Sequence, residues 1–150
     1  MTDPADERRV VVGVDGSAPS RLALQWAQFM AHVLDATIDA VTVWEISAFT
    51  ATEWAEDWDP EKEATTSLRT TIAEVLGSPP AVPVREIVRH GNAASEFVLA
   101  SQGAQLLVVG SRGHGGFAGL LIGSVSSAAA EHAHCPVLII HGDTPPPPRA

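Results

Sequence analysis

The chain has 150 residues, of which 45% are hydrophobic, and this fits one globular domain with a single buried core. A formal net charge of −9 argues against general nucleic-acid binding, which needs a basic surface. The apolar runs are too short for a membrane helix, the polar N-terminus has no signal-peptide pattern, and the single Cys135 excludes an internal disulfide. These features predict a cytoplasmic protein that binds no membrane.

Short β-branched segments alternate along the chain with amphipathic helical patterns. A first strand at residues 10–14 ends at Asp15-Gly16-Ser17, and Ser17 or Ser20 is placed to cap the helix that follows. Apolar residues at helical spacing from Ala23 to Leu34 mark that helix. The other expected elements are strands at 37–44, 82–88, 105–109 and 137–140, helices at 93–100 and 124–132, and a helix that carries Leu68, Ile72 and Val75 and stops at Gly77.

The two ends of the chain and one internal stretch differ from the rest in composition. We expect a flexible N-terminus at residues 1–8, a single domain at 9–142, and a disordered or polyproline-like tail at 143–150 that does not pack. Residues 45–63 are acidic and contain Trp54 and Trp58. This stretch is predicted to be a solvated loop and the start of a helix, and its role stays open.

The alternation of strands and helices predicts an α/β fold, with a five-stranded, mostly parallel sheet and helices on both faces. Ligands of such sheets bind beyond the carboxyl ends of the strands, where the strand order reverses. The loops after the first and fourth strands carry Asp15 and a glycine-rich segment. If these two strands are neighbours at the reversal, both loops face one ligand site.

The glycine-rich segment, residues 108–126, reads VVGSRGHGGFAGLLIGSVS. Glycines let a backbone approach a ligand closely, because they have no Cβ. The P-loop pattern is excluded because no lysine follows these glycines, and the dinucleotide fingerprint GxGxxG is absent after the first strand. What remains is Gly110-x-x-Gly113, nine residues, and then Gly123-Ser124.

Together with Val14-Asp15-Gly16-Ser17, this spacing closely resembles the ATP-binding branch of the universal stress protein family, over residues 9–140. The resemblance implies a single domain of the adenine-nucleotide alpha-hydrolase-like, Rossmann-like type, with strand order 3-2-1-4-5. It also implies a homodimer and a cytoplasmic, nucleotide-dependent module in the stress response or its regulation.

The resemblance assigns roles to individual residues. It places Asp15 by the ribose and adenine, and Val43 in the adenine pocket, with Val41 as the alternative. Residues 110–116 would wrap the phosphates, and the helix opened by Ser124 would offer its N–H groups and positive dipole end to them. The expected nucleotide-binding residues are Gly13, Val14, Asp15, Ser17, Val43, Gly110, Ser111, Arg112, Gly113, His114, Gly115, Gly116, Gly123, Ser124, Val125 and Ser126.

Charge limits how a nucleotide is held. Arg112 is the only Lys or Arg between Arg89 and Arg149. A triphosphate would therefore depend on backbone dipoles, Arg112 and Mg²⁺. ATP is the expected ligand, with ADP and AMP as alternatives. The His132, His134 and Cys135 group is interpreted as a helix end and a buried thiol, and no metal site built from protein ligands is predicted.

No catalytic set accompanies the predicted phosphate loop, which favours a binding module. The alternative is a slow ATPase or nucleotidyl-transfer enzyme that uses Asp15, Arg112 or His114. A nucleotide-free interaction protein, as in the family's other branch, is disfavoured by the intact glycine motif. The apolar strand at 137–140, if it lies at a sheet edge, is expected to pair with the same strand of a second copy. A protein partner cannot be identified from the sequence.

Overall fold

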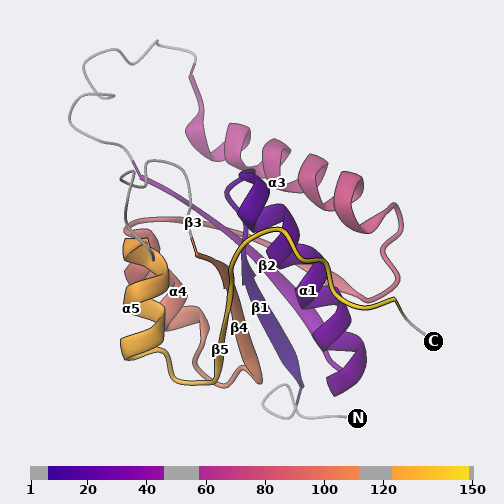
Figure 1. Ribbon diagram of the computed structural model, residues 1–150. Helices are drawn as coiled ribbons and strands as arrows, with labels where there is room; N and C mark the ends of the chain where they lie inside the picture. The colour runs from indigo at the N-terminus through magenta and orange to yellow at the C-terminus, as the bar shows by residue number, and fades with distance from the viewer. Residues whose placement is uncertain (1–6, 46–57, 112–122, 149–150) are drawn as a thin grey trace.

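The computed structural model describes residues 7–45, 58–111 and 123–148. Five parallel strands form one sheet with helices on both faces (Figure 1). The described elements are β1 (Arg9–Gly13), α1 (Ala18–Leu34), β2 (Thr37–Trp44), α3 (Pro60–Leu76), β3 (Val84–His90), α4 (Ala93–Ala100), β4 (Leu106–Gly110), α5 (Ser124–His132) and β5 (Val137–Ile140). The strand order is β3-β2-β1-β4-β5, which confirms the expected fold and order.

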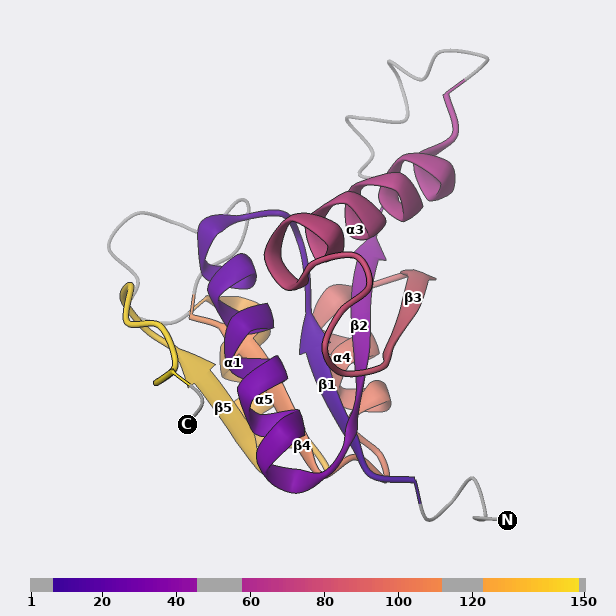
Figure 2. The ribbon, with the colours of Figure 1, turned by 90° about the vertical axis from the view of Figure 1, so that its right-hand side faces the viewer.

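Two apolar layers enclose the sheet. Val10 and Val12 of β1 point to the face covered by α1 and α3, whereas Val11 points to the face covered by α4 and α5. All three side chains have no exposed surface. Figure 2 shows α1 lying across the sheet, with the β5 edge on one side and the β3 edge on the other. Because β1 is buried on both faces, its carboxyl end is a rigid support for the loop that follows.

The helix starts follow from local side-chain chemistry. Ser17 caps α1, since its Oγ accepts a hydrogen bond from Ser20 N at 3.3 Å. Asn92 caps α4 in the same way, with 3.0 Å between its Oδ1 and Ser95 N. Among the described residues, no helix is long and apolar enough to cross a membrane.

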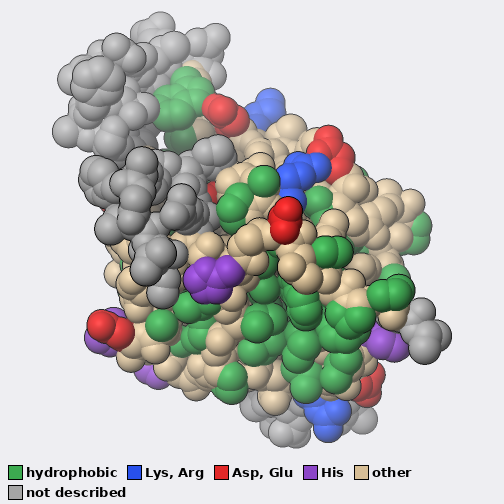
Figure 3. Space-filling view, in the orientation of Figure 1, with side chains coloured by type: hydrophobic (Ala, Val, Ile, Leu, Met, Phe, Trp, Pro, Cys, Tyr) green, Lys and Arg blue, Asp and Glu red, His purple; other side chains and the backbone are tan. Residues whose placement is uncertain are grey.

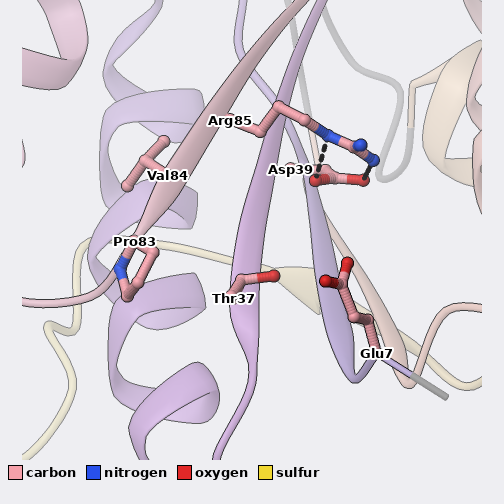
Figure 4. A pocket seen from close by; sticks show the side chains of 6 residues that line it. All are labelled: Glu7, Thr37, Asp39, Pro83, Val84 and Arg85. Atoms are coloured by element: carbon pink, nitrogen blue, oxygen red, sulfur yellow. Dashed lines mark hydrogen bonds and ion pairs between the residues drawn. The ribbon is translucent and has the colours of Figure 1, made fainter. Parts of the chain in front are cut away.

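A buried carboxylate ties three adjacent strands together. Asp39 of β2, whose side chain is 3% exposed, accepts a hydrogen bond from Arg9 of β1 at 2.8 Å and two from Arg85 of β3 at 2.8 and 3.0 Å. The hydrogen bonds and the charge of Asp39 raise the pKa of the Arg85 guanidinium above its ordinary value. This pair lies in a hollow of about 210 Å³ at the amino ends of β2 and β3, lined also by Glu7, Thr37, Pro83 and Val84 (Figure 4).

The structure differs from the expected elements at three strands and in the tail. Strands β1 (Arg9–Gly13) and β4 (Leu106–Gly110) are each shifted by one residue from the expected 10–14 and 105–109. Strand β3 begins at Val84 rather than at residue 82, because Pro83 has no N–H and joins the sheet only through its carbonyl, which accepts from Ile38 N at 2.9 Å. The described tail residues 141–148 contain no helix or strand, but they do contact the domain. Trp26 Nε1 of α1 donates a hydrogen bond to the Thr144 carbonyl at 2.9 Å, a contact that the sequence did not predict.

Candidate nucleotide site

The centre of the sheet is where the strand order reverses. Strands β1 and β4 are paired neighbours, with Val10 opposite Leu106 and Val12 opposite Val108. The chain leaves β1 toward α1 on one face and leaves β4 toward α5 on the other (Figure 1). The expected pairing of the first and fourth strands is therefore confirmed, and the loops that follow them both start at the carboxyl ends of the strands, where α/β proteins bind ligands.

The loop after β1 is organised by Asp15. Its Oδ1 accepts a hydrogen bond from Ser17 N at 2.9 Å and another from Ser17 Oγ. Gly16 makes the turn between them at φ +80°, a conformation that favours glycine. The Asp15 N–H donates to Ser20 Oγ at 3.2 Å, which ties the loop to the first turn of α1. An exposed carboxylate is thus held in a fixed position beside the start of a helix.

The same loop is fixed to β2 by contacts that the sequence did not reveal. Val14 N donates to the Val41 carbonyl at 2.8 Å, and Thr42 Oγ1 donates to the Val14 carbonyl at 2.7 Å. Val41 is 1% exposed and belongs to the core under α4. Val43 lies two residues nearer the carboxyl edge, is half-buried, and packs against that core. This geometry favours Val43 over Val41 as the apolar wall of a ligand site.

Gly13 has a packing role that the sequence did not show. A Cβ at this position would lie 2.9 Å from Cζ of Phe97, so the ring of α4 fits only against a glycine. Gly13 is buried at the end of β1. It therefore sets the position of the loop that follows β1.

The two ends of the predicted phosphate loop meet directly. Ser111 N donates to the Ile140 carbonyl at 2.9 Å, and Gly123 N donates to the Ser111 carbonyl at 2.7 Å. Ser126 Oγ lies 3.2 Å from the same Ser111 carbonyl and 3.1 Å from the Gly123 carbonyl. Gly110 is the last residue of β4. The remaining expected loop residues, Arg112, Gly113, His114, Gly115 and Gly116, lie outside the described residues.

The start of α5 brings backbone N–H groups to the same carboxyl end of the sheet. Gly123 is the N-cap residue, and no side chain in the described part of the chain caps the helix. Its first N–H groups and the dipole favour an anion. Ser124 is exposed and Val125 half-buried, whereas Ser126 is 1% exposed and turned inward. The arrangement assigns Ser126 to holding the loop ends together and leaves Ser124 as the hydroxyl that faces outward.

No three His, Cys, Asp or Glu residues within 7–45, 58–111 and 123–148 are placed to hold a metal ion. His132 lies 3.4 Å from Glu131, and Cys135 packs half-buried in the core under α4 and α5. Burial raises the pKa of the Cys135 thiol, against a smaller opposing effect of the Arg9 charge. The contacts of His132 and Cys135 in the structure are therefore those of a helix end and a half-buried thiol.

Known proteins resemble this chain along most of its length. The model of the universal stress protein family matches residues 7–141. A universal stress protein of Mycolicibacterium smegmatis is 32% identical over 150 residues, which cover 95% of this chain and 51% of that protein. The chain spans about half the length of the curated relatives it matches.

Solved structures show the same fold. Universal stress protein UspA from Lactobacillus plantarum superposes with a TM-score of 0.72 at 19% identity, over 89% of this chain and 97% of that one. A universal stress protein crystallised in complex with cAMP is 28% identical, with a TM-score of 0.59 over 89% of this chain and 96% of that one. With its matched family pattern, fold and strand order, the chain belongs to the universal stress protein family.

Proposed function

We propose that this chain is a cytoplasmic adenine-nucleotide-binding module of the stress response, with ATP as its ligand. The observation that carries the proposal is the junction at the sheet centre, where the Asp15 turn and the start of α5 both lie at the carboxyl ends of the strands, and where no side chain of the described residues caps α5. A fixed carboxylate suits ribose hydroxyls, and a helix start suits phosphate. The cAMP complex of a relative at 28% identity supports a nucleotide of this class.

The proposed contacts follow from the order of these groups along the carboxyl end of the sheet. Asp15, held by Ser17, accepts hydrogen bonds from the ribose, and Val43 packs against the base. The first N–H groups of α5 and the Ser124 hydroxyl donate to phosphate oxygens. Arg112 and the other loop residues up to 116 are proposed to complete the phosphate contacts.

Magnesium fits this arrangement as a companion of the phosphates. The described residues provide no group of three metal ligands, so Mg²⁺ would be held mainly by phosphate oxygens and water. It would supply charge neutralisation that a protein of net charge −9 lacks. We therefore expect ATP affinity to fall when Mg²⁺ is chelated. Calorimetric titrations with ATP, with and without chelator, measure this, and equal affinities would count against the metal.

The identity of the ligand and the class of function are tested together. Mass spectrometry of nucleotide released from freshly purified protein should find ATP, ADP or AMP. Steady-state turnover well below about 1 s⁻¹ in the presence of bound ATP supports a binding module. Turnover at or above that rate, abolished in Asp15→Ala, would instead establish the alternative, an ATPase or nucleotidyl-transfer enzyme.

We also propose a homodimer formed through β5. The two edge strands differ in charge: β3 exposes Arg85, Glu86 and Arg89, whereas β5 (Val137–Ile140) carries no charged side chain. Charged edges discourage strand pairing and apolar edges invite it. Antiparallel pairing of β5 with its copy makes a two-fold interface. Sedimentation velocity at micromolar concentration should show a dimer, and a monomer would refute this proposal.

A further inference from the structure

We propose that the C-terminal segment 141–148 is part of the surface through which two copies associate, and that Trp26 of α1 fixes it there. The inference rests on the homodimer proposed above. The added surface lies beside the β5 edge. It consists of the segment and of an apolar stripe on α1 formed by Trp26, Phe29, Met30 and Val33.

The segment is attached beside β5 at a defined point. Gly142 turns the chain directly after β5, with φ +67°. Two residues later the Thr144 carbonyl accepts a hydrogen bond from Trp26 Nε1 at 2.9 Å. The indole is itself held by Phe29, whose ring packs edge-to-face at 5.9 Å between centroids and 78° between planes. Figure 1 shows the segment running from the end of β5 across α1, and Figure 2 shows it beside the carboxyl end of β5.

The surface beside this anchor is apolar. Trp26, Phe29, Met30 and Val33 recur at the three- and four-residue spacing that places side chains on one helix face. Val33 is 59% exposed, one of two large hydrophobic residues that are exposed in the described part of the chain. Figure 3 shows hydrophobic side chains gathered over the region where Figure 1 has β5, α1 and the C-terminal segment. This face offers apolar area to a partner.

The size of β5 makes the flanking surface necessary. Four residues span about 13 Å, which is too little for the roughly 800 Å² per partner of a typical stable interface. The segment after it contains Pro145, Pro147 and Pro148, all exposed, and prolines have no N–H to extend a ladder. β5 therefore supplies the hydrogen bonds, while the proline rings and the α1 stripe supply apolar area. Two-fold symmetry brings this same face onto itself, so the occupant is a second copy.

The test compares the dissociation constant of the dimer among variants by sedimentation velocity over a dilution series. Removal of residues 143–150 should raise this constant at least about tenfold, since the proline part of the apolar flank is lost. Trp26→Phe keeps the aromatic body but removes the donor, and should raise it about three- to tenfold, the range for one hydrogen bond.

Two matched controls isolate the anchor. Thr144→Ala retains the carbonyl that Trp26 contacts and should leave the dissociation constant unchanged. Trp58→Phe removes an indole donor that bonds Glu63 at the start of α3, and should also leave it unchanged. A truncated chain that dimerises as tightly as the full chain, or more tightly, overturns this inference alone. A full chain that stays monomeric overturns the proposed homodimer and this inference with it.

Discussion

Gly13 is confined by the ring of Phe97, which leaves no room for a Cβ. Gly13→Ala should therefore destabilise the fold by about 1–3 kcal/mol, as overpacked cores do. Urea unfolding measures the loss. Because the clash is with one ring, Phe97→Leu added to Gly13→Ala should recover part of the stability that the glycine substitution costs. A double variant with the sum of both single losses would show that the contact with Phe97 does not limit the residue at 13.

Asp39 provides a second prediction for a single residue. Its carboxylate is nearly buried and faces two guanidinium groups, so Asp39→Asn leaves two charges on the sheet without their partner. We expect a loss of about 2–4 kcal/mol in the free energy of unfolding, somewhat below a fully buried pair because Arg85 is largely exposed. The matched control is Glu86→Gln, in an exposed pair with Arg69 at 3.3 Å, which should change stability by less than about 1 kcal/mol. Equal effects would contradict the role of Asp39.

At the scale of elements, the first turn of α5 contains two serines, Ser124 and Ser126, for which we predict different roles. Ser126→Ala removes a buried hydroxyl that bonds the Ser111 and Gly123 carbonyls, so the free energy of unfolding should fall by about 1–2 kcal/mol. Ser124→Ala removes an exposed hydroxyl and should lower ATP affinity by about two- to tenfold without changing stability. Thermal unfolding and calorimetry on both variants check this division. Ser127→Ala, on the exposed side of the same helix, should change neither quantity.

Patterns within an element were sufficient to predict most of the fold. Strands at 37–44 and 137–140 and helices at 93–100 and 124–132 have the bounds expected from the sequence, since β-branched runs and capping residues act locally. Strand β3 was placed two residues early because its apolar residues begin at Val82, before Pro83, which has no N–H to donate to a neighbouring strand.

The candidate site was only partly predictable, for a related reason. The Asp15 turn and the helix start at Gly123 depend on residues that are close in sequence. The spacing of glycine, aspartate and serine was therefore sufficient to predict them. The supports from Thr42 and Phe97 join residues far apart in sequence. No periodicity or motif marks such contacts, because they depend on how elements pack.

At the scale of the whole molecule, the proposed nucleotide site and the proposed dimer edge are in direct contact. Ser111, where the expected phosphate loop begins, donates to the carbonyl of Ile140, the last residue of β5. If nucleotide and dimerisation both act on this junction, each must change the affinity of the other by the same factor. We expect ATP to shift the dimer dissociation constant by at least about fivefold, measured by sedimentation with and without nucleotide. An unchanged constant would show that the two sites are independent.

The central claim is that phosphate binds at the start of α5, and Gly123 tests it most directly. Its φ of −72° and ψ of 167° suit any residue, and aspartate is a favoured N-cap, so Gly123→Asp should not lower thermal stability. Gly123→Asn, of the same shape but neutral, is the matched control. Calorimetric titration with ATP and Mg²⁺ should show affinity reduced more than about tenfold by the aspartate and much less by the asparagine. Gly123→Asp protein that binds ATP as tightly as the natural chain would contradict the account.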